Sequence, residues 1–285
     1  MDLFRSVLYL PASNARAIEK ARGLDCDAVI LDLEDAVAPD AKTEARAAAV
    51  EALSAGGFRP RVGVRVNGLD TAWGADDLTA LSGLQPAFVV APKIESPEAV
   101  RAVADRLSDG VAMWIMIETP LAVLRLDRIA GAGAPLAALM LGLNDFGEQM
   151  NLVPGPDRDP LKPWLAALVA AARGHGLLAI DGVVNATDDA DQLEAECRQG
   201  RAFGFDGKSL IHPNQIAAAN AAFSPSPEEV ARAREIVAAF AAAGAEGKGA
   251  IRVGYRMVER LHLDAAHRLL ARHDAASTPP QDTPI

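Results

Sequence analysis

The stretch Ala28-Val-Ile-Leu-Asp-Leu-Glu-Asp35 joins a short apolar run to three acidic residues, Asp32, Glu34 and Asp35. An uninterrupted apolar run of this length is typical of a strand that is buried on both faces of a parallel sheet. Carboxylates at the end of such a strand cost free energy unless a partner or a ligand uses them. The stretch therefore predicts a parallel sheet with functional groups at the carboxyl ends of its strands.

The same pattern recurs along the chain. Five further apolar runs end in polar side chains, at Arg65 and Asn67, Lys93, Glu118, Asp145 and Asp181. We expect strands to begin near residues 6, 28, 62, 87, 112, 136, 178 and 202. The helices predicted between them span residues 14–22, 42–53, 75–81, 97–107, 120–129, 161–173 and 188–199.

Eight strands that alternate with helices favour a closed (β/α)₈ TIM barrel of the α/β class. An open, doubly wound sheet is the alternative, and it is disfavoured because no glycine-rich dinucleotide-binding loop follows any predicted strand. Active sites of TIM barrels lie at the carboxyl ends of the strands. The barrel prediction therefore also accounts for the polar residues gathered there.

The chain changes character after the eighth predicted strand. A proline-rich turn at residues 224–227 precedes a helix over 228–243, a short segment over 251–255 and a last helix from about Met257 to Arg272. We predict a barrel over residues 1–222 and a C-terminal helical extension over 223–274. The extension would cover the barrel mouth or reach a neighbouring subunit. Residues 275–285 are rich in Pro, Thr and Ser and are expected to be disordered.

Composition narrows the class of protein. Half of the 285 residues are apolar, and the net charge is −10 with a pI near 5.0. No basic stripe suggests a nucleic-acid partner, and no apolar stretch is long enough to span a membrane. The two cysteines, Cys26 and Cys197, are expected to be buried thiols. With no leader-like segment at the start, we expect a cytoplasmic protein.

Two of the predicted strand-end residues, Glu118 and Asp145, belong to consecutive strands. Neighbouring parallel strands lie roughly 4.8 Å apart, and two carboxylates that close repel each other unless a proton or a cation lies between them. Without Cys or His nearby, the oxygen ligands favour Mg²⁺. The alternative is that each carboxylate caps the helix that follows it.

Arg65 ends a strand on the same rim. Its planar guanidinium suits a bidentate contact with a substrate carboxylate. A buried ion pair with Glu34 or Asp35 is the alternative, and the residues alone leave both open.

Several motifs resemble the citrate-lyase β-subunit-like enzymes of the HpcH/HpaI aldolase superfamily, in the same order over residues 5 to about 260. The matching stretches are Arg5-Ser-Val-Leu-Tyr-Leu-Pro11, Leu31-Asp-Leu-Glu-Asp-Ala-Val37, Val64-Arg-Val-Asn-Gly68, Ala91-Pro-Lys93, Ile117-Glu-Thr119, Gly142-Leu-Asn-Asp145, Gly204-Phe-Asp-Gly-Lys208 and Ile211-His-Pro-Asn-Gln215.

The resemblance implies a TIM barrel that assembles as a homotrimer or hexamer. It also implies Mg²⁺ held by Glu118 and Asp145, and contact of Arg65 with the oxo-acid part of an acyl-CoA substrate. The residues that would line the coenzyme A thioester are Tyr9, Pro11, Ser13, Asn14, Arg16, Lys42, Ile211 and His212. Four rim carboxylates, Asp32, Glu34, Asp35 and Asp181, are candidates for the first proton acceptor. Glu34 and Asp35 are expected to lie nearest Arg65.

One segment departs from the family pattern. Related enzymes resemble one another in an Asp-Gly-Lys-Met-Ile-Asp-x-Pro motif, whose last Asp is supplied to the active site of a neighbouring subunit. Here residues 253–261 place Glu259 at that Asp and Leu261 at the proline. Glu259 is accordingly a re-optimised catalyst, a group adapted to another reaction, or a surface residue without a role.

The expected activity is Mg²⁺-dependent carbon–carbon cleavage of a short 3-hydroxy dicarboxylic acyl-CoA, such as malyl-, methylmalyl- or citramalyl-CoA, with Glu259 protonating the enolate. The alternative is a (3S)-malyl-CoA thioesterase that releases malate and CoA from the same site. A second alternative is a non-catalytic subunit that binds an acyl-CoA or an oxo acid.

Overall fold

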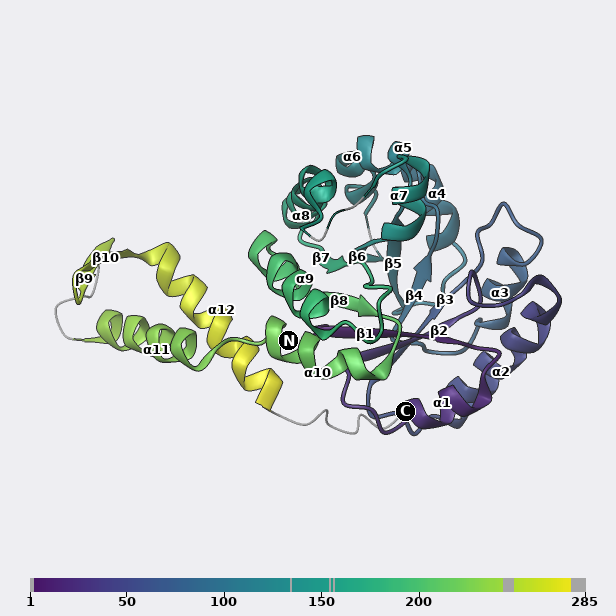
Figure 1. The fold of residues 1–285 in the computed structure, drawn as a ribbon, viewed down its shortest axis with the longest axis horizontal. Helices are drawn as coiled ribbons and strands as arrows, with labels where there is room; N and C mark the ends of the chain where they lie inside the picture. Colours follow the sequence, from purple (N-terminus) through teal and green to yellow (C-terminus); the bar gives the residue numbers. More distant parts are fainter. Residues whose placement is uncertain (1–2, 134, 154, 156, 243–248, 278–285) are drawn as a thin grey trace. The chain divides into compact units, whose positions relative to one another are not determined.

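The computed structural model describes residues 3–133, 135–153, 155, 157–242 and 249–277. Two compact units are distinguished, one formed by Phe4–Phe223 and the other mainly by the chain from Ser224 onwards. Figure 1 shows the ribbon of both units.

The first unit is a closed barrel of eight parallel strands in the order of the sequence, which confirms the predicted TIM barrel. Its strands are β1 (Ser6–Pro11), β2 (Ala28–Asp32), β3 (Arg61–Arg65), β4 (Phe88–Ala91), β5 (Ala112–Ile117), β6 (Leu136–Leu141), β7 (Leu178–Asp181) and β8 (Gly207–Leu210). The expectation that the eighth strand begins near residue 202 is wrong. The preceding helix continues to Phe203 and ends at Gly204, whose φ of 99° suits glycine.

Helices follow each strand and cover the outside of the barrel (Figure 1). They are α1 (Ala15–Ala21), α2 (Lys42–Ala55), α3 (Gly74–Ala80), α4 (Pro97–Ala104), α5 (Pro120–Leu124), α6 (Leu126–Ala130), α7 (Leu143–Gln149), α8 (Lys162–Gly174), α9 (Ala190–Phe203) and α10 (Ile216–Phe223). Several begin where a side chain accepts a hydrogen bond from the first turn, as Asn14, Ser96 and Thr119 do. Helix α7 was not predicted. Asp145 lies in its first turn and not at the end of a strand, as the sequence had indicated.

Side chains on the strands alternate between the barrel interior and the helical layer. The interior is filled by a cluster that includes Ile30, Phe88, Trp114 and Met140, with the rings of Phe88 and Trp114 stacked 3.8 Å apart. The alternation places Asp32, two residues after Ile30, on the inner side. Polar groups therefore form the last layer of the barrel interior, at its carboxyl end.

Asp181 and Lys208 occupy the alternate strand positions, whose side chains point away from the barrel interior and towards α9. Lys208 is fully buried and places its ammonium 3.2 Å from Asp181 and 3.3 Å from Glu196. Arg158 reaches both oxygens of Asp181, at 3.0 and 3.1 Å. Burial alone would raise the pKa of Asp181, but Lys208 and Arg158 hold it below its ordinary value. The expectation that Asp181 lies at the barrel rim is therefore wrong.

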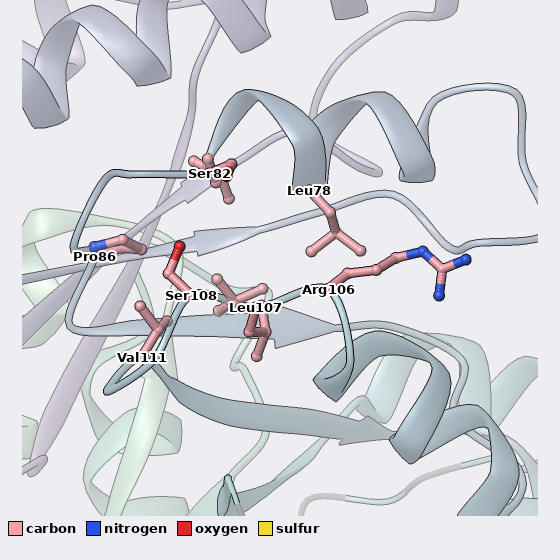
Figure 2. A pocket seen from close by; sticks show the side chains of 9 residues that line it. Leu78, Ser82, Pro86, Arg106, Leu107, Ser108 and Val111 are labelled. Atoms are coloured by element: carbon pink, nitrogen blue, oxygen red, sulfur yellow. The ribbon is translucent and has the colours of Figure 1, made fainter.

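A small pocket lies at the other end of the barrel, between α3 and the loop after α4 (Figure 2). It encloses about 10 Å³, and its lining includes Pro86 and Val111, which precede β4 and β5. It is too small for more than roughly one water molecule. Since it lies towards the amino ends of the strands, it is separate from the polar layer.

The second unit contains α11 (Pro227–Ala241), a hairpin of β9 (Ala250–Val253) and β10 (Arg256–Glu259), and α12 (Arg260–Ser277). Ala233, Ile236, Val258 and Ala266 form its small core. The prediction of a last helix from Met257 is wrong, because β9 and β10 pair as antiparallel strands and the helix begins at Arg260. The expected disorder from residue 275 is not seen at 275–277, which belong to α12, and residues 278–285 lie outside the described chain.

None of the described helices combines the length and the apolar character needed to cross a membrane.

Replacing Lys208 tests the buried charge network. Lys208→Met should lower the free energy of unfolding by about 3 kcal/mol, because it leaves the carboxylate of Glu196 short of a buried counter-ion. Chemical denaturation monitored by circular dichroism measures this change. Lys162→Met is the matched control: its ion pair with Asp159 is largely exposed, so the expected loss is under about 0.5 kcal/mol. Equal losses in the two variants would contradict the stabilising role.

Candidate active site

The central contact of the polar layer is an ion pair between β2 and β3. Asp32 and Arg65 are register partners in these strands. The guanidinium donates from Nε to Oδ1 and from Nη2 to Oδ2 of Asp32, both at 2.6 Å. Both residues are buried, and Asp32 also accepts the backbone N–H groups of Glu34 and Ala36. The pair therefore fixes the guanidinium and the start of the β2–α2 loop together.

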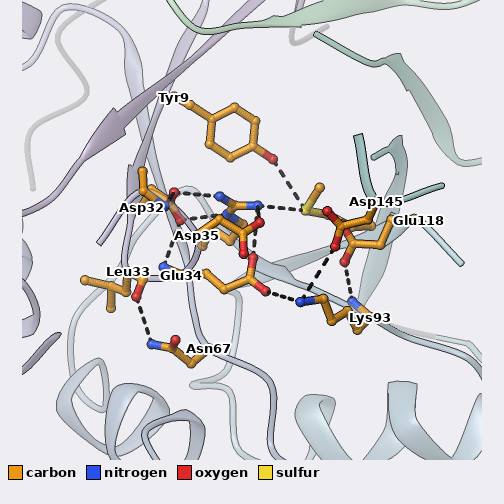
Figure 3. Close-up of polar contacts among 12 residues, drawn as sticks. Tyr9, Asp32, Leu33, Glu34, Asp35, Asn67, Lys93, Glu118 and Asp145 are labelled. Atoms are coloured by element: carbon orange, nitrogen blue, oxygen red, sulfur yellow. Dashed lines mark hydrogen bonds and ion pairs between the residues drawn. The ribbon is translucent and has the colours of Figure 1, made fainter. Parts of the chain in front are cut away.

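The remaining Nη1 corner of Arg65 faces two further carboxylates (Figure 3). It lies 2.9 Å from Oε2 of Glu34 and 3.3 Å from Oδ2 of Asp35. The ion-pair alternative from the sequence is therefore what the structure contains, with Asp32 as an additional partner that strand order had not ranked near Arg65. The bidentate edge of the guanidinium is occupied by Asp32. A contact of Arg65 with substrate stays a prediction and would use the Nη1 corner.

Tyr9 supports Arg65 from within the barrel. Its ring lies 4.8 Å from the guanidinium carbon, and its hydroxyl donates to the sulfur of Met140 at 2.9 Å. Burial raises its pKa, with nearby carboxylates adding to the rise and Arg65 opposing it. Tyr9 therefore stays a neutral hydrogen-bond donor, and its hydroxyl points into the barrel interior rather than towards solvent.

The other residues expected to line coenzyme A fall into two groups. Lys42 is buried, and its ammonium donates to the carbonyls of Leu33 and Glu34, both at 2.9 Å. It holds the β2–α2 loop instead of facing solvent. The rest lie around the ends of β1 and β8 with exposed or partly exposed side chains: Pro11, Ser13, Asn14, Arg16, Ile211 and His212.

Lys93, after β4, joins the two carboxylates expected to bind metal. Its backbone N–H donates to Oε1 of Glu118 at 2.6 Å, and its ammonium lies 3.7 Å from Oδ2 of Asp145. The ammonium is also 3.4 Å from Oε1 of Glu34. Glu118 packs so closely on Gly142 that a Cβ there would lie 2.5 Å from the Cβ of Glu118. Glu118, Asp145 and Glu34 thus meet around one residue that was not among the predicted site residues.

Negative charge exceeds positive charge in this layer. Two cationic side chains, Arg65 and Lys93, are surrounded by five carboxylates: Asp32, Glu34, Asp35, Glu118 and Asp145. Burial is the main cause that raises the pKa of Glu34 to about 7 and of Glu118 to about 8. The negative charge of Asp35 further raises the pKa of Glu34, and the negative charge of Glu34 further raises the pKa of Glu118.

One atom of this layer lacks a hydrogen bond. Oε2 of Glu34 is buried and has no hydrogen-bond partner among the described residues. The 2.9 Å separation from Arg65 Nη1 is an electrostatic contact without the alignment of a hydrogen bond. This oxygen therefore has an ion-pair contact but no aligned hydrogen-bond donor among the described residues.

The donor set fits a hard divalent cation. Among the residues described, no group of three or more His, Cys, Asp or Glu side chains is arranged to hold a metal. Mg²⁺ needs only one or two protein carboxylates, with water and substrate as its other ligands. Glu118 and Asp145 supply two carboxylates in a layer with excess negative charge, and the ammonium of Lys93 already lies beside Asp145.

Sequence comparison identifies the family. The family model for HpcH/HpaI aldolase/citrate lyase matches residues 5–213. The chain belongs to this family. Among solved structures, the CitE protein of Mycobacterium tuberculosis in complex with magnesium, acetoacetate and coenzyme A is similar with a TM-score of 0.80. It is 31% identical and covers 95% of this chain and 98% of that chain.

Relatives of two activities match over nearly the whole chain. A (3S)-malyl-CoA thioesterase of Cereibacter sphaeroides is 45% identical over 273 residues, which are 95% of each protein. An L-malyl-CoA/beta-methylmalyl-CoA lyase of the same organism is 33% identical over 303 residues, covering 96% of this chain and 95% of the lyase. Both relatives are enzymes, and this chain is an enzyme as well.

These identities overturn the activity ranked first from the sequence. Carbon–carbon cleavage was expected ahead of thioester hydrolysis, but the thioesterases are clearly more similar to this chain than the lyases are. The motifs of this sequence indicate the family, and they leave the choice between its reactions open. The non-catalytic alternative is set aside because both groups of relatives are enzymes.

Arg65→Lys tests the central ion pair. Lysine keeps the charge but loses the planar two-bond contact with Asp32. We expect the free energy of unfolding to fall by about 2 kcal/mol, as for other losses of a buried charge-assisted pair. Denaturant titration measures it. The control Arg101→Lys alters an exposed pair with Glu98, and its stability should stay within about 0.5 kcal/mol of wild type. A similarly small effect at Arg65 would refute the central role.

Proposed function

We propose that this enzyme is a Mg²⁺-dependent thioesterase that hydrolyses (3S)-malyl-CoA to malate and CoA. The observation that carries the proposal is the 45% identity to thioesterases of that name over 95% of both chains. The site supports it, because thioester hydrolysis needs a base that activates water and a positive centre that stabilises the developing oxyanion.

Glu34 is the candidate base. Its side chain is buried, its Oε2 lacks a hydrogen-bond donor among the described residues, and its pKa is raised to about 7. A base with a pKa near the working pH is well suited to proton transfer. Asp35 is the second candidate; it is half exposed and contacts the same Nη1 of Arg65 at 3.3 Å.

Hydrolysis then follows from these groups. Glu34 accepts a proton from a water molecule, and the water oxygen adds to the thioester carbonyl carbon. The carbon–sulfur bond breaks, and the departing CoA sulfur takes up the proton held by Glu34, which gives free thiol and malate and restores the Glu34 carboxylate. Glu118 and Asp145 would hold Mg²⁺, which as a Lewis acid polarises substrate oxygens when bound.

Coenzyme A binding and subunit assembly are further parts of the proposal. The exposed residues around the ends of β1 and β8, among them Ser13, Arg16 and His212, would contact coenzyme A. The crystallised CitE complex with coenzyme A supports binding of such a ligand by this fold. We further propose a cytoplasmic homo-oligomer, a trimer or hexamer, in which Glu259, exposed at the end of β10, serves a neighbouring subunit.

The products distinguish hydrolysis from cleavage. With (3S)-malyl-CoA and Mg²⁺, we expect one equivalent of free thiol for each thioester consumed, measured with a thiol reagent, and no glyoxylate detectable with phenylhydrazine. EDTA should abolish the thiol signal, and added Mg²⁺ should restore it. Release of glyoxylate while the thioester persists would refute the thioesterase proposal.

The pH profile tests Glu34. Because the ionised carboxylate is the active form, kcat/KM should fall tenfold per pH unit below the pKa of Glu34, which is about 7 without metal. Bound Mg²⁺ adds positive charge near Glu34 and would move this acidic limb of the pH profile to lower pH. Glu34→Gln should lower kcat by roughly 10²-fold or more and remove the limb. Asp40→Asn, an exposed acid of the same loop, is the control. An unchanged profile in Glu34→Gln would exclude Glu34 as the base.

Asp145→Asn tests the metal site. Loss of one of two carboxylates should weaken Mg²⁺ binding at least tenfold, measured by isothermal titration calorimetry without substrate. Asp191→Asn removes an exposed acid from the first turn of α9 and should leave the affinity unchanged. If Asp145→Asn bound Mg²⁺ as wild type does, the assignment of Asp145 would fail.

A further inference from the structure

Lys93 has a conformation that the surrounding structure must impose. Its backbone φ is 51°, and Lys93 is one of three non-glycine residues with positive φ in the described chain. This left-handed region is unfavourable for lysine. The conformation accompanies a short hydrogen bond, 2.6 Å, from the backbone N–H to Glu118. The backbone of Lys93 therefore fixes one of the two proposed metal-binding carboxylates.

The side chain of Lys93 contacts the other one. Its ammonium lies 3.7 Å from Asp145 and 3.4 Å from Glu34. These separations are longer than those of Arg65 with Asp32, which are 2.6 Å. Moreover, the side chain of Lys93 is 45% exposed, against 8% for Arg65. Arg65 is thus a fixed cation of the site, whereas the ammonium of Lys93 is loosely paired and free to move towards solvent.

We propose that Lys93 is a positioning residue that serves as an internal counter-ion for the metal site. Without Mg²⁺, its ammonium offsets the excess negative charge of Asp145 and Glu34. When Mg²⁺ binds, the ammonium leaves Asp145, while the backbone N–H continues to orient Glu118. The inference rests on the metal site of the proposed function and adds a residue that competes with the metal for the same carboxylate.

A counter-ion has a different signature from a residue that only stabilises the fold. Removing its charge should destabilise the metal-free protein, because the carboxylates then repel each other without compensation. The same change should strengthen Mg²⁺ binding, because the metal no longer displaces a cation or approaches a like charge. A purely structural residue would lower stability without raising the affinity for Mg²⁺.

Lys93→Asn is the test variant, since asparagine tolerates positive φ and carries no charge. We expect Mg²⁺ to bind about five- to tenfold more tightly than to wild type in calorimetric titrations without substrate. Without metal, the variant should melt at a lower temperature than wild type does. Added Mg²⁺ should raise the melting temperature of the variant by more than it raises that of wild type. Lys93→Arg, which keeps the charge, should bind Mg²⁺ with an affinity close to that of wild type.

Lys162→Asn removes a lysine that pairs with Asp159 elsewhere on the barrel unit and should leave Mg²⁺ affinity unchanged. If wild type binds Mg²⁺ and Lys93→Asn binds it equally or more weakly, the counter-ion role is overturned while the metal site stands. If wild type does not bind Mg²⁺, the metal site of the proposed function fails, and the role of Lys93 fails with it.

Discussion

The bidentate ion pair between Arg65 and Asp32 is the contact on which the rest of the site depends. Two buried charges at the carboxyl end of a barrel are tolerated only when each satisfies the other, and this geometry does so with two 2.6 Å hydrogen bonds. Once Asp32 holds the guanidinium, its free corner determines where Glu34 and Asp35 lie. The backbone N–H groups that bind Asp32 tie the β2–α2 loop to the same point.

Two buried charge networks in the described part of the barrel differ in balance. Under α9, Arg158 and Lys208 match Asp181 and Glu196 one for one, and the network is closed off by the helix. At the mouth, five carboxylates share Arg65 and Lys93, and burial leaves Glu34 and Glu118 with raised pKa values. A balanced network stabilises the fold. An unbalanced one favours a proton or a metal ion, which is the physical basis for placing the chemistry at the mouth.

Relatives named as lyases and relatives named as thioesterases both match this chain over nearly its whole length. The residues proposed to hold a metal and to contact the substrate would serve either reaction, because both require stabilised negative charge on oxygen. Water activation distinguishes hydrolysis, and a buried carboxylate with a raised pKa and an oxygen that lacks a hydrogen bond is suited to it. Glu34 has these properties, whereas Glu259 belongs to the other compact unit and its part in the reaction stays a prediction.

The sequence by itself determined the barrel, the family and most polar residues of the mouth, because strand periodicity and strand-end position are local properties of the chain. It placed Glu118 and Asp145 on neighbouring strands, but it did not detect α7, whose first turn carries Asp145. It also grouped Asp181 with the mouth, although strand parity turns that side chain outwards. Only the tertiary structure decided which of these side chains contact one another. Asp32 meets Arg65 through strand register, and Lys93 reaches Glu118, Asp145 and Glu34 through a left-handed backbone. Such contacts join residues up to 59 positions apart in the chain, and they depend on register and backbone conformation that no local pattern encodes.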